Sequence, residues 1–176
     1  YMIANANPWD NLKFDVEGVG EVQRKFFGTL YNTYSFFTLY ANIDNFDNSL
    51  DQIKYKNRPE IDCWIISELN TLIEKVDSNY SNYEPTKAAR NISFFTQEHL
   101  SNWYVRLSRR RFWKGKLSQD KISAYQTLFE CILTISKLAA PIAPFFMDSL
   151  YIDLNQNTGF ETNLSVHLSK SVSYTH

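Results

Sequence analysis

Apolar residues recur at spacings of three and four in four long stretches of the chain, as they do on one face of an α-helix. These stretches predict helices over about 17–42, 59–80 and 118–138, and a further helix from Pro85 to a break at Gly115. A shorter fifth helix is expected from position 141 or 142 to about 154.

Proline and serine mark the ends of the predicted helices. Pro59 and Pro85 suit the first turn of the second and third helices, where the missing N–H removes no intrahelical hydrogen bond. Ser118 can cap the fourth helix, with Asp120 favourable in its first turn, and Pro141 ends it. Only five glycines and five prolines occur among 176 residues, which argues against a many-stranded sandwich or barrel.

Amphipathic helices joined by short loops predict an all-α fold, an antiparallel bundle of four to five helices. We expect three regions: a polar, Asn-rich strap at 1–16, the bundle at 17–155 and a C-terminal extension at 156–176. Within the extension, the Val-His-Leu run at 166–168 could pair as a strand. With 44% hydrophobic and 21% charged residues, the chain is too apolar for a disordered protein. It also lacks the run of about 18 apolar residues that a membrane span needs.

The third helix carries two predicted faces. At 100° per residue, one stripe is expected to be buried: Leu100, Trp103, Tyr104 and Leu107. A second group falls on a different, exposed face: Asn102, Arg106, Arg109 and Trp113. Arg111 shares the azimuth of the buried stripe, so it is the arginine expected to have a structural role.

The stretch 99–119 is the one unusual segment in its charge. It contains no acidic residue but six basic ones: Arg106, Arg109, Arg110, Arg111, Lys114 and Lys116. Arginines beside exposed aromatic rings suit RNA, because guanidinium groups pair with phosphates and unstacked bases stack on rings. The alternative is a solvated helix end whose cations lie near the negative end of the helix dipole. The net charge of −1 excludes a uniformly basic RNA-binding protein but not a local basic patch.

No catalytic, cofactor-binding or metal-binding residues are predicted. The sequence has no phosphate-binding loop, dinucleotide fingerprint or His-Glu-x-x-His motif. Its three histidines are isolated from one another, and Cys63 and Cys131 lie in apolar helical stripes, which favours a packing role. An independent enzyme is therefore disfavoured. The open alternatives are an RNA-binding module and a helical protein-interaction or scaffold domain.

Six segments, in this order, carry a resemblance to a known family. They are Asn7-Pro-Trp-Asp-Asn-Leu-Lys-Phe-Asp15, Arg24-Lys-Phe-Phe-Gly-Thr-Leu-Tyr-Asn-Thr-Tyr34, Arg58-Pro-Glu-Ile-Asp-Cys-Trp64, Tyr83-Glu-Pro-Thr-Lys-Ala88, Ser101-Asn-Trp-Tyr-Val-Arg-Leu-Ser-Arg-Arg-Arg-Phe-Trp113 and Leu138-Ala-Ala-Pro-Ile-Ala-Pro-Phe145. Together they resemble the anticodon-binding helical domain of isoleucyl-tRNA synthetases, which are class I aminoacyl-tRNA synthetases. The resemblance extends over about 1–168.

The resemblance implies a role in protein biosynthesis. The whole enzyme of this family activates isoleucine with ATP and Mg²⁺ and charges tRNA, and a cytoplasmic location is expected. The family's nucleotide-binding signatures precede the strap and are not in this chain, which is expected to start just after the catalytic domain and to be non-catalytic alone, without a cofactor. Its expected partners are the isoleucine tRNA and the catalytic and C-terminal domains, and no membrane. The anticodon stem and loop are expected at Asn102, Arg106, Arg109, Arg110, Arg111, Trp113, Lys114 and Lys116.

Overall fold

The computed structural model describes residues 16–48, 52–113, 115–156, 161 and 163–169, and in these residues every regular element is helical. The elements are α1 Val16–Val22, η1 Gln23–Gly28, α2 Thr29–Ile43, η2 Tyr55–Asn57, α3 Glu60–Ser81, α4 Pro85–Phe94, η3 Phe95–Val105, α5 Arg106–Trp113, α6 Gln119–Ala139, α7 Pro144–Gln156 and η4 Val166–Leu168. The π-helical segments η1 and η3 continue into their neighbours through helical backbone, so 16–43 and 85–113 each form one long helix. The all-α prediction is confirmed.

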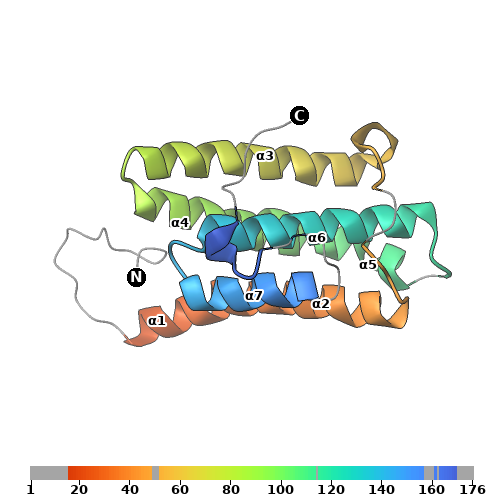
Figure 1. The fold of residues 1–176 in the computed structure, drawn as a ribbon, viewed down its shortest axis with the longest axis horizontal. Coiled ribbons are helices and arrows are strands. Elements are labelled where there is room, and N and C mark those ends of the chain that lie inside the picture. The colour runs from red at the N-terminus through yellow and green to blue at the C-terminus, as the bar shows by residue number, and fades with distance from the viewer. Residues whose placement is uncertain (1–15, 49–51, 114, 157–160, 162, 170–176) are drawn as a thin grey trace.

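The long helices lie side by side along the long axis of the molecule, and consecutive helices run in opposite directions (Figure 1). The central helix is α6, which contacts α2, α3, α4, α5 and α7. Sixteen of its 21 residues are buried. Most of its side chains are apolar or small and polar, so nearly all sides of this helix can pack inside the bundle.

The helix ends follow the predicted signals with small shifts. Ser118 caps α6, since its hydroxyl accepts a hydrogen bond from the Lys121 N–H at 3.2 Å. Pro85 occupies the first turn of α4, whereas Pro59 is the residue that precedes α3. The last helix begins at Pro144, slightly later than expected. Residues 1–15 of the predicted strap lie outside the described residues.

The predicted burial of Trp103 and Leu107 is wrong: both side chains are 58% exposed. The cause is η3, because an i→i+5 helix holds more residues in each turn than the 3.6 of an α-helix. Residues that are four positions apart then lie on the same face of the helix and form one line along it. The buried residues of this line are Thr96, Leu100, Tyr104, Ser108 and Phe112. Phe112 therefore enters the core, where its ring lies 5.1 Å from Phe36 and 5.0 Å from Tyr125.

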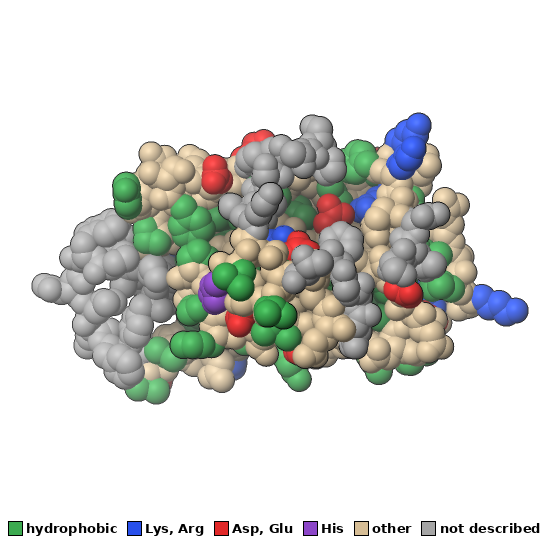
Figure 2. All heavy atoms as spheres, viewed as in Figure 1, with side chains coloured by type: hydrophobic (Ala, Val, Ile, Leu, Met, Phe, Trp, Pro, Cys, Tyr) green, Lys and Arg blue, Asp and Glu red, His purple; other side chains and the backbone are tan. Residues whose placement is uncertain are grey.

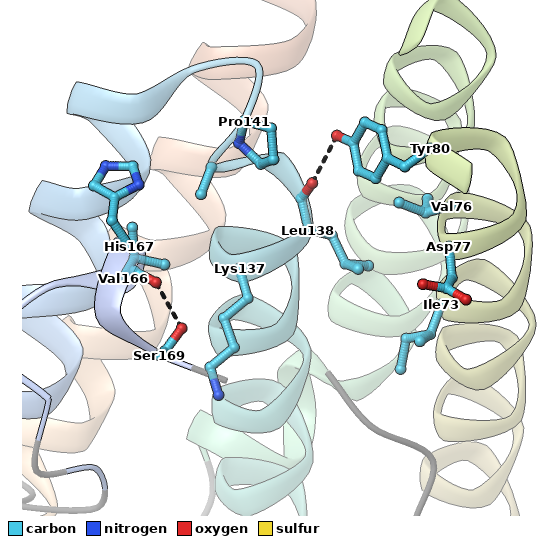
Figure 3. Close-up of a pocket in the computed structure, with 11 residues that line it drawn as sticks. Ile73, Val76, Asp77, Tyr80, Lys137, Leu138, Pro141, Val166, His167 and Ser169 are labelled. Atoms are coloured by element: carbon cyan, nitrogen blue, oxygen red, sulfur yellow. Dashed lines mark hydrogen bonds between the residues drawn. The ribbon is translucent and has the colours of Figure 1, made fainter. Parts of the chain in front are cut away.

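The run 166–168 forms a turn of 3₁₀-helix, η4, and not the expected strand. Asp148 on α7 fixes it, since Oδ1 accepts hydrogen bonds from the Ser165 hydroxyl at 2.7 Å and the Val166 N–H at 2.9 Å. A hollow of about 300 Å³ is lined by residues of η4, α3 and the end of α6 (Figure 3). The Tyr80 hydroxyl at its edge donates to the Leu138 carbonyl at 2.9 Å, and burial raises the pKa of Tyr80 to about 12. That hydroxyl is held as a neutral donor that joins α3 to α6.

Candidate nucleic-acid interface

Six of the eight residues predicted to contact RNA have exposed side chains, and we call them the α5 basic surface: Asn102, Arg106, Arg109, Arg110, Trp113 and Lys116. The three arginines form no ion pair with any described residue. The indole of Trp113 is 57% exposed. Lys or Arg side chains, drawn in blue, project at the end of the bundle that holds η2 and the start of α6 (Figure 2). The predicted exposed face thus exists, whereas Lys114 lies outside the described residues.

Arg111 differs from its neighbours because carboxylates hold its guanidinium. Nη1 and Nη2 donate to the two oxygens of Asp62 at 2.6 and 2.8 Å, and Nε donates to Asp120 at 3.1 Å. The Asp62 carboxylate is fully buried and also accepts the hydroxyls of Tyr104 at 2.8 Å and Ser123 at 2.5 Å. Arg111 therefore joins α5 to the N-terminal ends of α3 and α6, as its predicted structural role requires.

The ionisation of this cluster follows from its burial and its charges. Burial by itself would lower the pKa of Arg111, but the hydrogen bonds and charge of Asp62 outweigh it and raise that pKa above its ordinary value. Burial, with the nearby charge of Asp62, raises the pKa of Tyr104 well above 10. The cluster is thus a fixed Arg–Asp pair with a neutral phenol, and it sets the direction in which α5 points.

A second ion pair, formed by buried Lys121 and half-buried Asp44, holds the connection between α5 and α6. The Lys121 ammonium lies 2.5 Å from Asp44 Oδ2 at the end of α2 and donates to the Gly115 carbonyl at 3.4 Å. Burial alone would raise the pKa of Asp44, but the hydrogen bonds from Lys121 and Tyr125 lower it. Gly115 has a φ of +67°, a left-handed conformation in which glycine carries no Cβ strain. The turn that presents Lys116 is therefore tied to two helices.

The sequence reasoning missed two further cations at this end, Lys54 and Lys56. Both are exposed in the segment that leads to α3. This segment is anchored on α6, where the Ile53 N–H donates to Gln126 Oε1 at 3.0 Å and Arg58 donates to Thr127 at 3.1 Å. The basic run 54–58 was visible in the sequence, but its position beside α6 depends on these long-range hydrogen bonds.

The arrangement of charges and an exposed ring suits a nucleic-acid ligand. Unpaired guanidinium groups can pair with phosphates, and the exposed indole beside them can stack on bases.

Within the described residues, no group of three or more His, Cys, Asp or Glu residues is placed to hold a metal ion. Burial raises the pKa of Cys131 well above its ordinary value, so this thiol stays protonated. No helix in the described part of the chain has the length and apolar character to cross a membrane.

The family model for the anticodon-binding domain of tRNA ligase matches residues 62–174, and the chain belongs to this family. The match includes Asp62, the whole α5 basic surface and the central helix α6. It confirms the family resemblance and the helical fold that the sequence predicted.

The relatives extend this similarity to nearly the whole chain. The chain is 61% identical to an isoleucine–tRNA ligase of Bacteroides fragilis over 99% of its own length, which is 15% of that protein. It is 63% identical to an isoleucine–tRNA ligase of Porphyromonas gingivalis over 96% of its length, which is 14% of that protein. An isoleucine–tRNA ligase of Dehalococcoides mccartyi is 48% identical over the same 96%. The chain thus spans about a seventh of the curated relatives that it matches.

Proposed function

We propose that this chain is the part of an isoleucine–tRNA ligase that holds the anticodon stem and loop of the isoleucine tRNA. The contact is made by the α5 basic surface. The observation that carries this proposal is the contrast within one helix: Arg111 is bound by two carboxylates, whereas Arg106, Arg109 and Arg110 have no ion-pair partner among the described residues. The cations that the fold leaves unpaired lie beside an exposed tryptophan.

The arginines and Lys116 contact phosphates, and Trp113 stacks on an unpaired base. Phosphate contacts position the RNA, and a stacking platform accepts any base, so this surface supplies affinity more than base identity. Lys54 and Lys56 extend the positive charge beyond α5. Because the overall charge is only −1, affinity comes from this one end of the bundle.

The whole ligase activates isoleucine with ATP and Mg²⁺ and charges tRNA in the cytoplasm, and this chain serves it by binding. The rest of that polypeptide, with its catalytic and C-terminal domains, is then a partner of this bundle. The chain alone carries no nucleotide-binding signature, so we expect neither ATP–pyrophosphate exchange nor aminoacylation from it. Exchange activity in a preparation free of host synthetase would contradict this assignment.

Salt dependence of tRNA binding tests the contact itself. We expect about four to six phosphate contacts, and each adds about −0.7 to −0.9 to the slope of log affinity against log salt concentration. Affinity should therefore fall by roughly two to three decades between ~50 and ~200 mM salt. A titration with the isoleucine tRNA and a second tRNA also separates backbone from base recognition. Binding that does not respond to salt would favour the alternative, a protein-interaction domain with a solvated basic helix end.

A further inference from the structure

An apolar groove of about 640 Å³ lies between α3 and the long helix 85–113. Ile61 and Trp64 of α3 form one wall. Trp103 and Leu107 form the other wall, and both are 58% exposed. The π-helical turns of η3 produce this groove, because they rotate these two side chains out of the core.

The charge of the groove is opposite to that of the α5 basic surface. Glu60 and Glu68 line it, and no lysine or arginine does so among the described residues. His99 is held inside, with Nδ1 3.3 Å from Glu68 Oε2 and its ring 5.8 Å from the ring of Trp64. Carboxylates repel phosphate groups, so this groove does not suit RNA. Two indoles with two carboxylates suit a cation that carries apolar surface.

We propose that the groove binds a polypeptide segment that presents a lysine or arginine beside apolar side chains. On the basis of the proposed function, this segment belongs to the longer ligase polypeptide. The basic side chain lies over the indoles between Glu60 and Glu68, and an apolar neighbour packs on Trp103 and Leu107. Long aliphatic stems with charged ends suit such a groove.

Two observations support this occupant over the others. Soluble monomers rarely expose large contiguous apolar patches without a binding role, and here Trp103 and Leu107, about one helical turn apart, are exposed together. The curated relatives devote about 85% of their length to residues outside the matched segment, because the match covers 15% of them. An occupant in the same polypeptide is also present at high effective concentration, so a groove with only modest affinity for it is sufficient.

Trp103 and Trp113 provide an internal comparison, because they are exposed to nearly the same extent on one helix. Hydroxyl-radical footprinting read by mass spectrometry reports each indole separately. We would label this chain alone and the full-length ligase that contains it, each with and without tRNA. Trp103 should lose most of its labelling in the full-length ligase without tRNA, whereas Trp113 should lose labelling only when tRNA is added.

A charge reversal tests the chemistry of the occupant. Glu68→Lys in the full-length ligase should restore the labelling of Trp103, while Glu74→Lys, an exposed substitution further along α3, should leave it protected. Equal labelling of Trp103 in the chain and in the full-length ligase would overturn the proposal. Protection of Trp103 only by tRNA, or protection in the isolated chain that grows with its concentration, would also overturn it, in favour of RNA or a second copy. Failure of the proposed function is distinct, since it would appear as Trp113 unprotected by tRNA.

Discussion

Arg111 and Asp62, 49 residues apart in the chain, form a paired contact in which each terminal guanidinium nitrogen binds its own carboxylate oxygen. Arg110, the residue before it, is exposed and forms no ion pair with a described residue. Of these two adjacent arginines, one thus holds helices together, and the other is available for the tRNA contact that we propose.

This difference predicts that the two arginines contribute very differently to the stability of the fold. Arg111→Ala leaves a fully buried carboxylate without its cation and should cost about 3–5 kcal/mol of unfolding free energy. Arg111→Lys should also destabilise the protein, because an ammonium cannot reproduce the two parallel hydrogen bonds. Arg110→Ala is the matched control and should change stability by less than about 0.5 kcal/mol. Urea denaturation measures all three, and equal midpoints would contradict the assignment of Arg111.

Arg106→Ala and Arg109→Ala should weaken tRNA binding with little effect on the melting temperature, because both side chains are exposed. Each loss of a phosphate contact should reduce the slope of log affinity against log salt by about 0.7–0.9. Lys75→Ala, on the exposed side of α3, serves as a control for general charge. If the control reduces the slope as much as the arginine variants do, the contact face lies elsewhere.

Trp113→Ala should reduce tRNA affinity by about 1–3 kcal/mol through lost stacking. Trp113→Phe retains a ring and should recover part of this loss. The measurement is a binding titration at fixed salt, paired with a melting curve for each variant. An affinity unchanged in Trp113→Ala would exclude the indole as a stacking platform.

The helix boundaries were largely predictable, and the face of the third helix was not. Local signals such as Pro85 and the Ser118 cap act within a few residues, so they can be recognised without the fold. The π-turns of η3 leave no comparable signal, and a 3.6-residue period placed Trp103 inside. The Asp62 partner of Arg111 was equally hidden, because it comes from another helix. The exposure of the other arginines was predictable, because charged side chains that face water need no contact with another helix.

The π-helical turns of η3 change which side chains of this helix are buried, and this changes the expected effect of two substitutions. Trp103→Ala, which the 3.6-residue period would rank as a core cavity, should cost less than about 1 kcal/mol because the indole is mostly exposed. Leu100→Ala removes a fully buried side chain and should cost about 2–5 kcal/mol. Chemical denaturation of both variants measures the loss of unfolding free energy. A larger loss for Trp103→Ala than for Leu100→Ala would show that the Trp103 side chain is buried in the core.

Asp148 makes the docking of η4 dependent on pH. The Ser165 hydroxyl and the Val166 N–H lower the pKa of the Asp148 carboxyl below its ordinary value. Its stabilising effect is therefore complete above the unfolded pKa of about 3.9 and is lost as the pH falls through the lower folded value. The stability difference between wild type and Asp148→Asn should narrow below about pH 4. A difference that is constant with pH would show that the carboxylate charge is not involved, and Glu74→Gln, exposed on α3 and outside the hollow beside η4, controls for surface charge.

The burial of α6 on nearly all sides affects how the protein can change over evolution. In most helices of a bundle, tolerated substitutions alternate with intolerant ones at the helical period. In α6, small polar residues such as Ser123, Thr127 and Ser136 are as buried as Leu128 and Ile132, so both kinds are constrained by size. In a library of random variants, α6 should therefore appear as a nearly continuous block of positions that tolerate few substitutions. Sequence variation should be concentrated on the outer surfaces of the helices that surround it.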